Sequence, residues 1–475
     1  MKIDIRDLTI ESTHAHLVKG DFSAIELAQA YLDEIASKNQ EINAYLEVYE
    51  DVISQAKHAD SLFAQKKATL LTGIPLAVKD NILIQGKIAS ASSKMLENYK
   101  ATYDATVISK LKKEGVVFLG RTNMDEFAMG SSTENSAYGV TKNPHDTSRV
   151  PGGSSGGSAS AVAGFLALGS LGSDTGGSIR QPASFCGCVG LKPTYGAVSR
   201  SGLMAMGSSL DQIGPITKTV TDAEIIYKAI QGKDALDSTS IDEASYPIHA
   251  KKNILGIPKG LLEQKGLHKD VVSNFKESIE KLKGLGFMIQ EIDVPDMSQA
   301  LSIYYILMPA EVSSNLARFD GVKYGFHAEG KDLLDEYLNT RREGFGKEVR
   351  RRILLGTYVL STGYYDAYYN KAVALKEAMT EDFKKIFSEV DVILTPTTPT
   401  PAFKIGEKTS DPLEMYLADI FTVTANIVGV PALSLPSGFS KAGDKKLPLG
   451  IQFMAAHGNE SMLFEVGKKF LGEKL

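Results

Sequence analysis

Two segments rich in glycine and serine, separated by an apolar helix, constrain this chain more than any other feature of its sequence. The first runs from Val150 to Ser158 and the second from Gly172 to Ser178, and the apolar segment Ala159 to Leu168 is predicted to form the helix between them. Tracts of this composition are often flexible linkers. Here the helix tethers both segments to a core, and the second contains Asp174 and Thr175. We therefore predict two ordered loops that belong to an active site.

The second loop can supply an oxyanion hole. A serine that follows two glycines and opens a helix has free backbone N–H groups beside its hydroxyl, which is the arrangement that a tetrahedral oxyanion requires. Gly176-Gly-Ser178 precedes such a helix start at Ile179. Ser178 is therefore the candidate nucleophile. The patterns G-x-x-x-x-G-K-[ST] and G-x-G-x-x-G, which would indicate phosphate or dinucleotide binding, are missing from this segment. The candidate oxyanion donors are the backbone amides of Thr175, Gly176, Gly177 and Ser178.

No histidine motif in the sequence identifies the base that would activate this serine. A serine hydroxyl needs a base, and none of the eight histidines lies in a comparable motif near the loops. Lysine can serve where burial lowers its pKa. Lys79 follows the predicted buried strand Ile74–Val78, at the edge of a sheet where α/β active sites gather. The position also fits an ordinary lysine at a strand end, so the residues alone leave its role open.

Apolar periodicity predicts an α/β fold. Residues 1–65 are predicted to be helical, with a capping box at Ser23–Glu26, whereas short apolar strands alternate with helices beyond residue 70. We expect an α/β/α sandwich with a large twisted mixed β-sheet, and one domain over residues 1–475. Its predicted strands are Ile74–Val78, Val116–Leu119, Asn253–Pro258, Phe287–Val294, Val392–Leu394, Ala432–Leu435 and Leu449–Phe453, and its predicted helices include Thr106–Glu114, Val271–Leu285, most of 300–390 and a terminal helix from Glu460.

Composition excludes several classes of function. The net charge of −5 argues against direct recognition of a nucleic acid by this chain. Cys186 and Cys188 are too few for a disulfide scaffold and lack further metal ligands nearby, so we expect buried thiols in a reducing compartment. The N-terminal residues do not resemble a signal peptide, and no run of about 20 apolar residues indicates a membrane span. A cytoplasmic enzyme without a bound metal is the expectation.

The glycine-serine segments resemble the amidase signature family. In that family a strand lysine and one serine from each loop form a catalytic triad, so the resemblance implies Lys79, Ser154 and Ser178 as the triad. It also implies the amidase-signature version of the α/β/α sandwich and a cis peptide between Gly153 and Ser154. The segments that carry the resemblance are Gly152–Ser158, Asp174–Pro182 and Cys186–Thr194.

Other segments resemble the A subunits of bacterial-type aspartyl/glutamyl-tRNA amidotransferases. The resemblance implies an amidase that hydrolyses glutamine and supplies ammonia for converting Glu-tRNA(Gln) to Gln-tRNA(Gln). Whether Asp-tRNA(Asn) is also converted to Asn-tRNA(Asn) stays open from the sequence. The resemblance also implies a heterotrimer with B and C subunits, in which a partner holds the mischarged tRNA, ATP and Mg, and no cofactor on this chain. These segments are Met124–Ser132, Ser313–Gly321, Glu343–Arg352 and Gly363–Tyr369.

Glutamine as a substrate sets a requirement that the sequence can meet. Its α-carboxylate and α-ammonium call for a cation and an anion in the pocket. The resemblance assigns Arg352 to the carboxylate and Asp419 to the ammonium. It also implies that the substrate site is lined by Tyr304 or Tyr305 and by Met129, Gly130 and Ser131.

Three alternatives stay open from the sequence. The chain could be a free-standing amidase for small amides, or a scaffold or tRNA-binding module. Gly153-Ser-Ser-Gly-Gly157 also fits G-x-S-x-G, the nucleophile elbow, with Ser155 central and His457 as base. An elbow requires a strand directly before it, and Thr147 to Gly152 is a poor strand.

Overall fold

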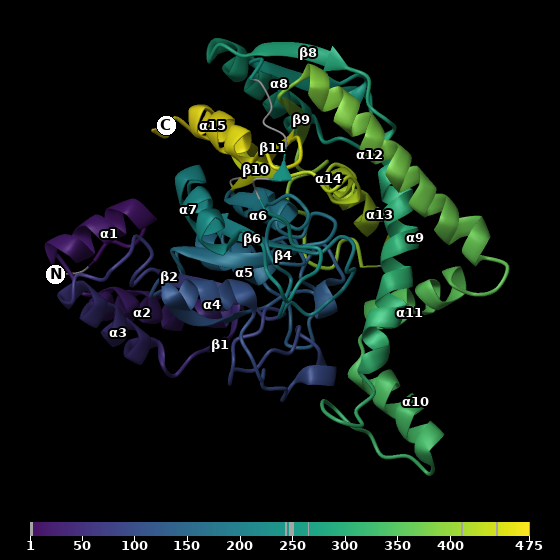
Figure 1. The fold of residues 1–475 in the computed structure, drawn as a ribbon, viewed down its shortest axis with the longest axis horizontal. Helices are drawn as coiled ribbons and strands as arrows, with labels where there is room; N and C mark the ends of the chain where they lie inside the picture. The colour runs from purple at the N-terminus through teal and green to yellow at the C-terminus, as the bar shows by residue number, and fades with distance from the viewer. Residues whose placement is uncertain are drawn as a thin grey trace.

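A computed structural model describes residues 3–242, 245–246, 251–264, 266–409, 412–442 and 445–474. Its strands form one 11-stranded sheet in the order β1-β3-β2-β4-β6-β5-β10-β11-β9-β7-β8 (Figure 1). The strands are β1 (Tyr45–Val48), β2 (Pro75–Lys79), β3 (Val117–Thr122), β4 (Gly169–Asp174), β5 (Val189–Lys192), β6 (Gln212–Thr217), β7 (Ile254–Pro258), β8 (Met288–Ile292), β9 (Val392–Pro396), β10 (Ala432–Ala442) and β11 (Lys445–Ala455).

The sheet is mixed, as predicted. β2 runs parallel to both of its neighbours, β3 and β4, whereas β6 is antiparallel to β4 and to β5. The first six strands in the sheet order precede residue 218, and the other five follow residue 253. These two halves join where β5 pairs with β10, through Lys192 opposite Ala432 and Leu191 opposite Leu433. The sheet therefore has an N-terminal half and a C-terminal half.

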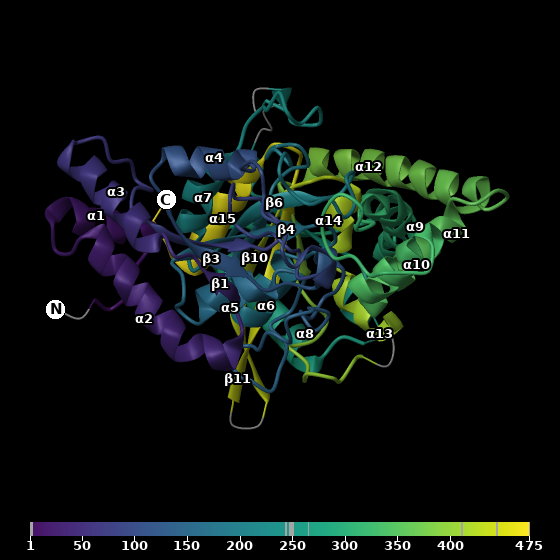
Figure 2. The same ribbon diagram turned by 90° about the horizontal axis from the view of Figure 1, so that it is seen from below.

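Helices cover both faces of the sheet (Figure 2). One layer contains α4 (Thr106–Lys113), α7 (Val220–Ile230) and α15 (Glu460–Leu471). The other contains α5 (Gly156–Ala163) and α6 (Arg180–Cys186). α8 (Lys269–Gly284) lies on the α15 side, where Lys281 contacts the ring of Phe470. This arrangement confirms the predicted α/β/α sandwich.

Helices also pack at the two ends of the molecule. The N-terminal helices α1 (Ile10–Lys19), α2 (Ala24–Ile42) and α3 (Val52–Ala64) lie beside the β1 end of the sheet (Figure 1). Ser23 accepts a hydrogen bond from the amide of Glu26, and the Glu26 side chain accepts one from the amide of Ser23, which confirms the capping box. Residues 1–65 are not wholly helical, however, because β1 follows α2.

The opposite end is built from α9 (Met297–Asn315), α10 (Leu333–Gly344), α11 (Lys347–Val359), the π-helix η6 (Tyr365–Asn370) and α12 (Lys371–Glu389). These helices confirm the prediction for residues 300–390. α9 and α11 cross closely, since a Cβ on Gly356 would lie 1.8 Å from the carbonyl oxygen of Pro309. Short helices complete the fold: η1 (Lys94–Leu96), η2 (Glu126–Ala128), η4 (Leu261–Glu263), η5 (Leu316–Arg318), α13 (Pro412–Tyr416), η7 (Leu417–Asp419) and α14 (Val423–Ile427).

Two predicted boundaries in the glycine-serine region are wrong. The helix between the segments is α5, which ends at Ala163 and not at Leu168, and the start of the second segment belongs to β4 and not to a loop. β4 is buried along its whole length between β2 and β6. Small residues suit this position, because a Cβ on Gly172 would lie 2.9 Å from the hydroxyl oxygen of Ser155.

Both cysteine thiols, of Cys186 and Cys188, are free and buried, as expected from their number and spacing. No helix among the described residues has both the length and the apolar character needed to cross a bilayer.

Candidate active site

Lys79 meets the first glycine-serine loop inside the protein. It is the last residue of β2, and its side chain is fully buried. Its Nζ lies 2.8 Å from Oγ of Ser154. It also lies 2.8 Å from Oγ and 3.2 Å from the carbonyl oxygen of Ser173, on the neighbouring strand β4. The parallel pairing of β2 with β4 therefore brings the lysine to Ser173, while the first loop supplies Ser154.

The surroundings of Lys79 favour an uncharged amine. Burial lowers its pKa from 10.5 to about 7, although the carboxylates of Asp125, Asp174 and Asp211 act in the opposite direction. A neutral amine has two N–H groups and one lone pair. The two N–H groups can be directed at Ser173, which leaves the lone pair for the hydroxyl proton of Ser154. Lys79 is thus placed to accept a proton near neutral pH.

The second loop connects β4 to α6 and is held by a buried ion pair. Burial alone would raise the pKa of Asp174, but Arg180 outweighs it and holds that pKa at about 2. Arg180 Nη2 and Nε each lie 3.0 Å from a carboxylate oxygen of Asp174. The same carboxylate accepts the amides of Gly177, at 2.8 Å, and Ile179, at 3.1 Å. The ionised aspartate therefore fixes the backbone on both sides of Ser178.

Glycine is required in this loop for steric reasons. Gly177 has φ +130°, and a Cβ there would lie 2.1 Å from Oγ1 of Thr422. The Thr422 hydroxyl donates at 2.7 Å to the carbonyl oxygen of Gly176. Because the Gly177 amide already donates to Asp174, the amides of Thr175, Gly176 and Ser178 are the more available of the candidate oxyanion donors.

Ser178 lies next to the first loop, and its side chain makes no hydrogen bond to that of Ser154. The loops are joined through the backbone, since the amide of Ser155 donates to the carbonyl oxygen of Ser178 at 3.1 Å. Within the described ranges, no side-chain hydrogen bond of Ser178 accompanies this link, and the residue is 8% exposed. The peptide between Gly153 and Ser154 is cis, as the resemblance implied. The structure thus brings Lys79 and Ser154 together and leaves the hydroxyl of Ser178 unengaged.

The candidate anion of the substrate site is Asp419. Its carboxylate accepts a hydrogen bond from Oγ of Ser131 at 2.6 Å, and the residue is only 7% exposed. Burial raises the pKa of Asp419 to about 7, while Ser131 and Arg352 oppose the increase. A buried carboxylate that is half-protonated at neutral pH would gain from a cationic ligand.

The candidate cation, Arg352, projects from α11 into the same region. It is 3% exposed, and its Nε lies 2.8 Å from Oε1 of Glu348. Its guanidinium carbon lies 5.6 Å from the ring centroids of both Tyr305 and Tyr416, which are stacked on each other at 3.9 Å. These contacts orient the guanidinium and leave it only partly neutralised.

The two candidate tyrosines have different neighbours. Tyr304 borders the second loop, because a Cβ on Gly176 would lie 2.8 Å from its Cζ, whereas Tyr305 faces Arg352. Met129 is buried, and a Cβ on Gly130 would lie 2.4 Å from the carboxylate of Asp125.

Sequence reasoning missed several residues that hold the site together. Ser173 receives both N–H contacts of Lys79, and Asn81 donates to its hydroxyl at 3.0 Å. Asp125 donates its amide to the carbonyl oxygen of Ser154, and Gln181 accepts the amide of Gly153, so the two residues bind the backbone on either side of the cis peptide. Ser173 lies in the second glycine-serine segment and could have been singled out there. Asp125 and Gln181 lie within segments that carry the family resemblance, Met124–Ser132 and Asp174–Pro182, but no chemical pattern in those segments or around Asn81 indicates their contacts with the first loop or β4.

The nucleophile-elbow alternative is not supported. No strand precedes Ser155 in residues 147–154, which the structure describes. The hydroxyl of Ser155 instead donates to the carbonyl oxygen of Ser173 at 3.1 Å and so holds the first loop against β4.

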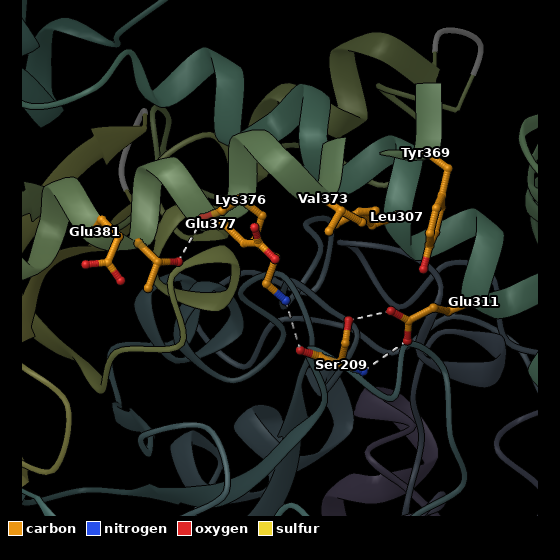
Figure 3. A pocket seen from close by; sticks show the side chains of 9 residues that line it. Ser209, Leu307, Glu311, Tyr369, Val373, Lys376, Glu377 and Glu381 are labelled. Carbon is orange, nitrogen blue, oxygen red and sulfur yellow. Dashed lines mark hydrogen bonds between the residues drawn. The ribbon is translucent and has the colours of Figure 1, made fainter. Parts of the chain in front are cut away.

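A separate cavity of about 360 Å³ lies between α9 and α12 (Figure 3). Glu311 accepts hydrogen bonds from the amide and hydroxyl of Ser209, and Lys376 points at the same residue. The triad residues do not line it. The lining residues are Ser209, Leu307, Glu311, Tyr369, Val373, Lys376, Glu377, Thr380 and Glu381.

In the part of the chain that the structure covers, no group of three or more His, Cys, Asp or Glu side chains is arranged to hold a metal ion.

Known proteins resemble this chain over almost its whole length. The family model described as Amidase matches residues 26–464. The glutamyl-tRNA(Gln) amidotransferase A subunit of Thermoanaerobacter pseudethanolicus is 52% identical, over 98% of this chain and 96% of the relative. The crystal structure of the glutamyl-tRNA(Gln) amidotransferase A subunit from Thermotoga maritima superposes with a TM-score of 0.81 at 40% identity, covering 99% of this chain and 95% of the other. A native peptide amidase from Stenotrophomonas maltophilia gives a TM-score of 0.82 at 27% identity, covering 98% and 96%.

Proposed function

This chain belongs to the amidase family, and we propose that it is the glutamine-hydrolysing A subunit of a tRNA-dependent amidotransferase. The single observation that carries the chemistry is the buried Lys79 amine, 2.8 Å from the Ser154 hydroxyl, with a pKa lowered by burial to about 7. Relatives named as A subunits of glutamyl-tRNA(Gln) amidotransferase, at 52% identity, support the choice of subfamily.

The first half-reaction acylates Ser178. Neutral Lys79 accepts the hydroxyl proton of Ser154, Ser154 accepts that of Ser178, and Ser178 Oγ forms a bond to the side-chain amide carbon of glutamine. The carbonyl oxygen becomes an oxyanion that accepts hydrogen bonds from the loop amides. When this intermediate collapses, the C–N bond breaks and the proton on Lys79 returns through Ser154 to the leaving nitrogen. Ammonia departs, and a glutamyl ester remains on Ser178.

The second half-reaction releases glutamate. Water attacks the ester carbon while Ser154 and Lys79 take its proton, and the same amides hold the second oxyanion. The C–O bond to Ser178 then breaks, and the proton returns to its oxygen. The free enzyme is restored with no net change in protonation of the triad.

The substrate pocket fits a free amino acid. The buried guanidinium of Arg352 would bind the α-carboxylate, and Asp419, held by Ser131, would bind the α-ammonium. Tyr304 would line the space beside the second loop, and Tyr305 would orient Arg352. Met129 and Gly130 would form the adjoining wall. Two ion pairs to the charged groups on the α-carbon select glutamine over amides that lack these charges.

The ammonia would serve partner subunits of the B and C type, which would hold the mischarged tRNA, ATP and Mg. The acidic net charge of −5 is consistent with a partner that binds the tRNA. α10, α11, η6 and α12 carry a set of exposed apolar side chains, which supports association with a partner. We call this set the helical apolar surface, and it includes Leu333, Leu334, Leu338, Leu354, Leu355, Tyr358, Tyr365, Tyr368 and Leu375.

Ser178→Ala tests the proposal directly. In the full chain purified with its co-purifying subunits, we expect loss of glutamine hydrolysis and of glutamine-dependent transamidation, with ammonia-dependent transamidation retained. Ser37→Ala on the exposed surface of α2 is the matched control and should keep both activities. Unchanged glutaminase activity in Ser178→Ala would remove Ser178 from its role.

A second candidate is a free-standing amidase, favoured by the structural similarity to a peptide amidase. Such an enzyme has no need for the Arg352–Asp419 pair. Hydrolysis of simple aliphatic or aryl amides by the isolated chain, without preference for glutamine, would support this candidate over the first.

A further inference from the structure

We propose that Asp125 and Gln181 are positioning residues. Together they fix the position of the Gly153–Ser154 peptide relative to Ser131 of the substrate site. The inference deepens the proposed function and rests on it, because it concerns the same site. It is independent of which amide donor is used, since neither residue is placed in contact with the substrate.

Asp125 joins the two parts of the site through its backbone and its carboxylate. Its amide donates to the carbonyl oxygen of Ser154 at 3.2 Å. Its Oδ2 accepts the amides of Ser132, at 3.3 Å, and Thr133, at 2.9 Å, and its Oδ1 accepts the amide of Asn135 at 3.2 Å. One fully buried residue therefore holds the triad serine and the segment that follows Ser131.

Gln181 makes a second connection between the same two places. Its Oε1 accepts the amide of Gly153 at 2.9 Å, and its Nε2 donates to the carbonyl oxygen of Ser131 at 2.9 Å. Gln181 lies in α6, directly after Arg180, so the buried ion pair with Asp174 also fixes its position. Both hydrogen-bonding groups of its amide are thus used to connect the loops.

The backbone fits closely around both side chains. A Cβ on Gly153 would lie 2.1 Å from Oδ2 of Asp125, and one on Gly152 would lie 2.4 Å from Oε1 of Gln181. The cis peptide is therefore enclosed by the two residues, and movement of either would shift the Ser154 hydroxyl relative to Lys79. Displacements of about 1 Å in such a site can reduce the rate about 100-fold.

Asp125 has an additional effect that Gln181 lacks, because it is charged. Three carboxylates face Lys79: Asp125, Asp174, which Arg180 neutralises, and Asp211, which accepts a hydrogen bond from Thr175. Asp125 itself is faced by Lys79 and by Glu134, and burial raises its pKa to about 6. Ionised Asp125 stabilises the ammonium form of Lys79, so its removal should make the lysine neutral at lower pH.

Two variants of nearly equal volume separate position from charge. Asp125→Asn and Gln181→Met should each lower kcat for glutamine hydrolysis ~10-fold or more. Asp125→Asn weakens the hold of residue 125 on the backbone amides that follow Ser131, and Gln181→Met removes both hydrogen bonds between the loops. Of these two variants, only Asp125→Asn should shift the acidic limb of the plot of kcat/KM against pH. Its midpoint should move to lower pH by ~0.3 pH unit or more. Gln181→Glu should move this limb upward, since it places a new carboxylate near Lys79.

Asp222→Asn is the control for loss of a buried carboxylate. Asp222 accepts the amide of Ile10 at 2.9 Å in the N-terminal region, so its substitution should reduce stability without altering the limb. Identical limbs in wild type, Asp125→Asn and Gln181→Glu, together with unchanged kcat in Gln181→Met, would overturn the inference. If Asp125→Asn does not fold, the two Gln181 variants still test it. A wild-type complex without glutaminase activity would instead contradict the proposed function.

Discussion

At the scale of single residues, the proposed role of Lys79 as the base makes activity depend on its protonation state. The amine must be neutral to accept a proton, and burial lowers its pKa to about 7. Lysine is neutral above its pKa, so kcat/KM for glutamine should rise as pH increases from 6 to 8 and then level off. A pH–rate profile of the wild-type complex measures this. A profile that is flat from pH 5.5 to 9 would exclude a titrating lysine as the base.

Asp419 makes a second prediction at this scale. Its carboxyl must be ionised to bind an ammonium, and burial raises its pKa to about 7. KM for glutamine should therefore fall as pH rises through 7. Asp419→Asn should raise KM about 10-fold or more and remove that dependence, because a charged hydrogen bond worth about 1.5–3 kcal/mol is lost.

The comparison for Asp419→Asn is Ser131→Ala, which removes one hydrogen bond to the carboxylate and leaves its charge. It should raise KM by a smaller factor. Equal KM values for wild type and Asp419→Asn would show that the ammonium is bound elsewhere.

The sequence and its family resemblance indicated the residues proposed to react better than the residues that hold them. Lys79, Ser154 and Ser178 lie in patterns with a chemical meaning, and the structure joins the first two. Asp125 and Gln181 contact Gly153 or Ser154, which lie 28 or 29 residues away in the chain. Such contacts depend on how loops are enclosed in the fold, and no local periodicity records them.

At the scale of elements, the crossing of α9 and α11 controls the position of Arg352. Gly356 contacts the backbone of Pro309 so closely that a methyl group cannot be accommodated. Gly356→Ala should therefore separate the helices, lower the free energy of unfolding by about 1–3 kcal/mol and raise KM, since Arg352 lies one turn earlier on α11. Thermal unfolding and glutamine kinetics measure the two effects.

Gly284→Ala is the matched helix substitution. Gly284 ends α8, and no atom lies within 4 Å of where its Cβ would be. The change should be neutral or stabilising by about 0.5–1 kcal/mol, because alanine has the higher helix propensity. Equal destabilisation by both substitutions would mean that the close crossing of α9 and α11 is not the reason why position 356 requires glycine.

Elements with apolar periodicity were predicted well, and small or short ones were not. β2, β3, β7, β8 and β9 follow from runs of branched apolar residues. β4, with the sequence Gly-Ser-Leu-Gly-Ser-Asp, lacks that signal, since its fit between β2 and β6 depends on small side chains. β1 has only four residues, and its pairing with β3 is a distant contact.

At the scale of the whole molecule, the helical apolar surface predicts how the chain associates. Leu354, 70% exposed, is central to this surface on α11. Leu354→Asp should prevent co-purification of the partner subunits and leave the melting temperature unchanged, because the side chain makes no contribution to the core. Leu236→Asp, at a site 77% exposed in the loop after α7, should leave co-purification intact. Retention of the partners by Leu354→Asp would place their binding site elsewhere.

The two halves of the sheet have consequences for how enzymes of this shape diverge. The residues proposed to break the amide bond, 79, 154 and 178, belong to the N-terminal half, while Tyr304, Arg352 and Asp419 belong to the C-terminal half. Substitutions at these three positions of the C-terminal half can therefore alter which amide is admitted without replacing a residue proposed to react. During evolution, substrate preference can thus change through substitutions in one half of the chain while selection conserves the proposed reacting residues in the other half.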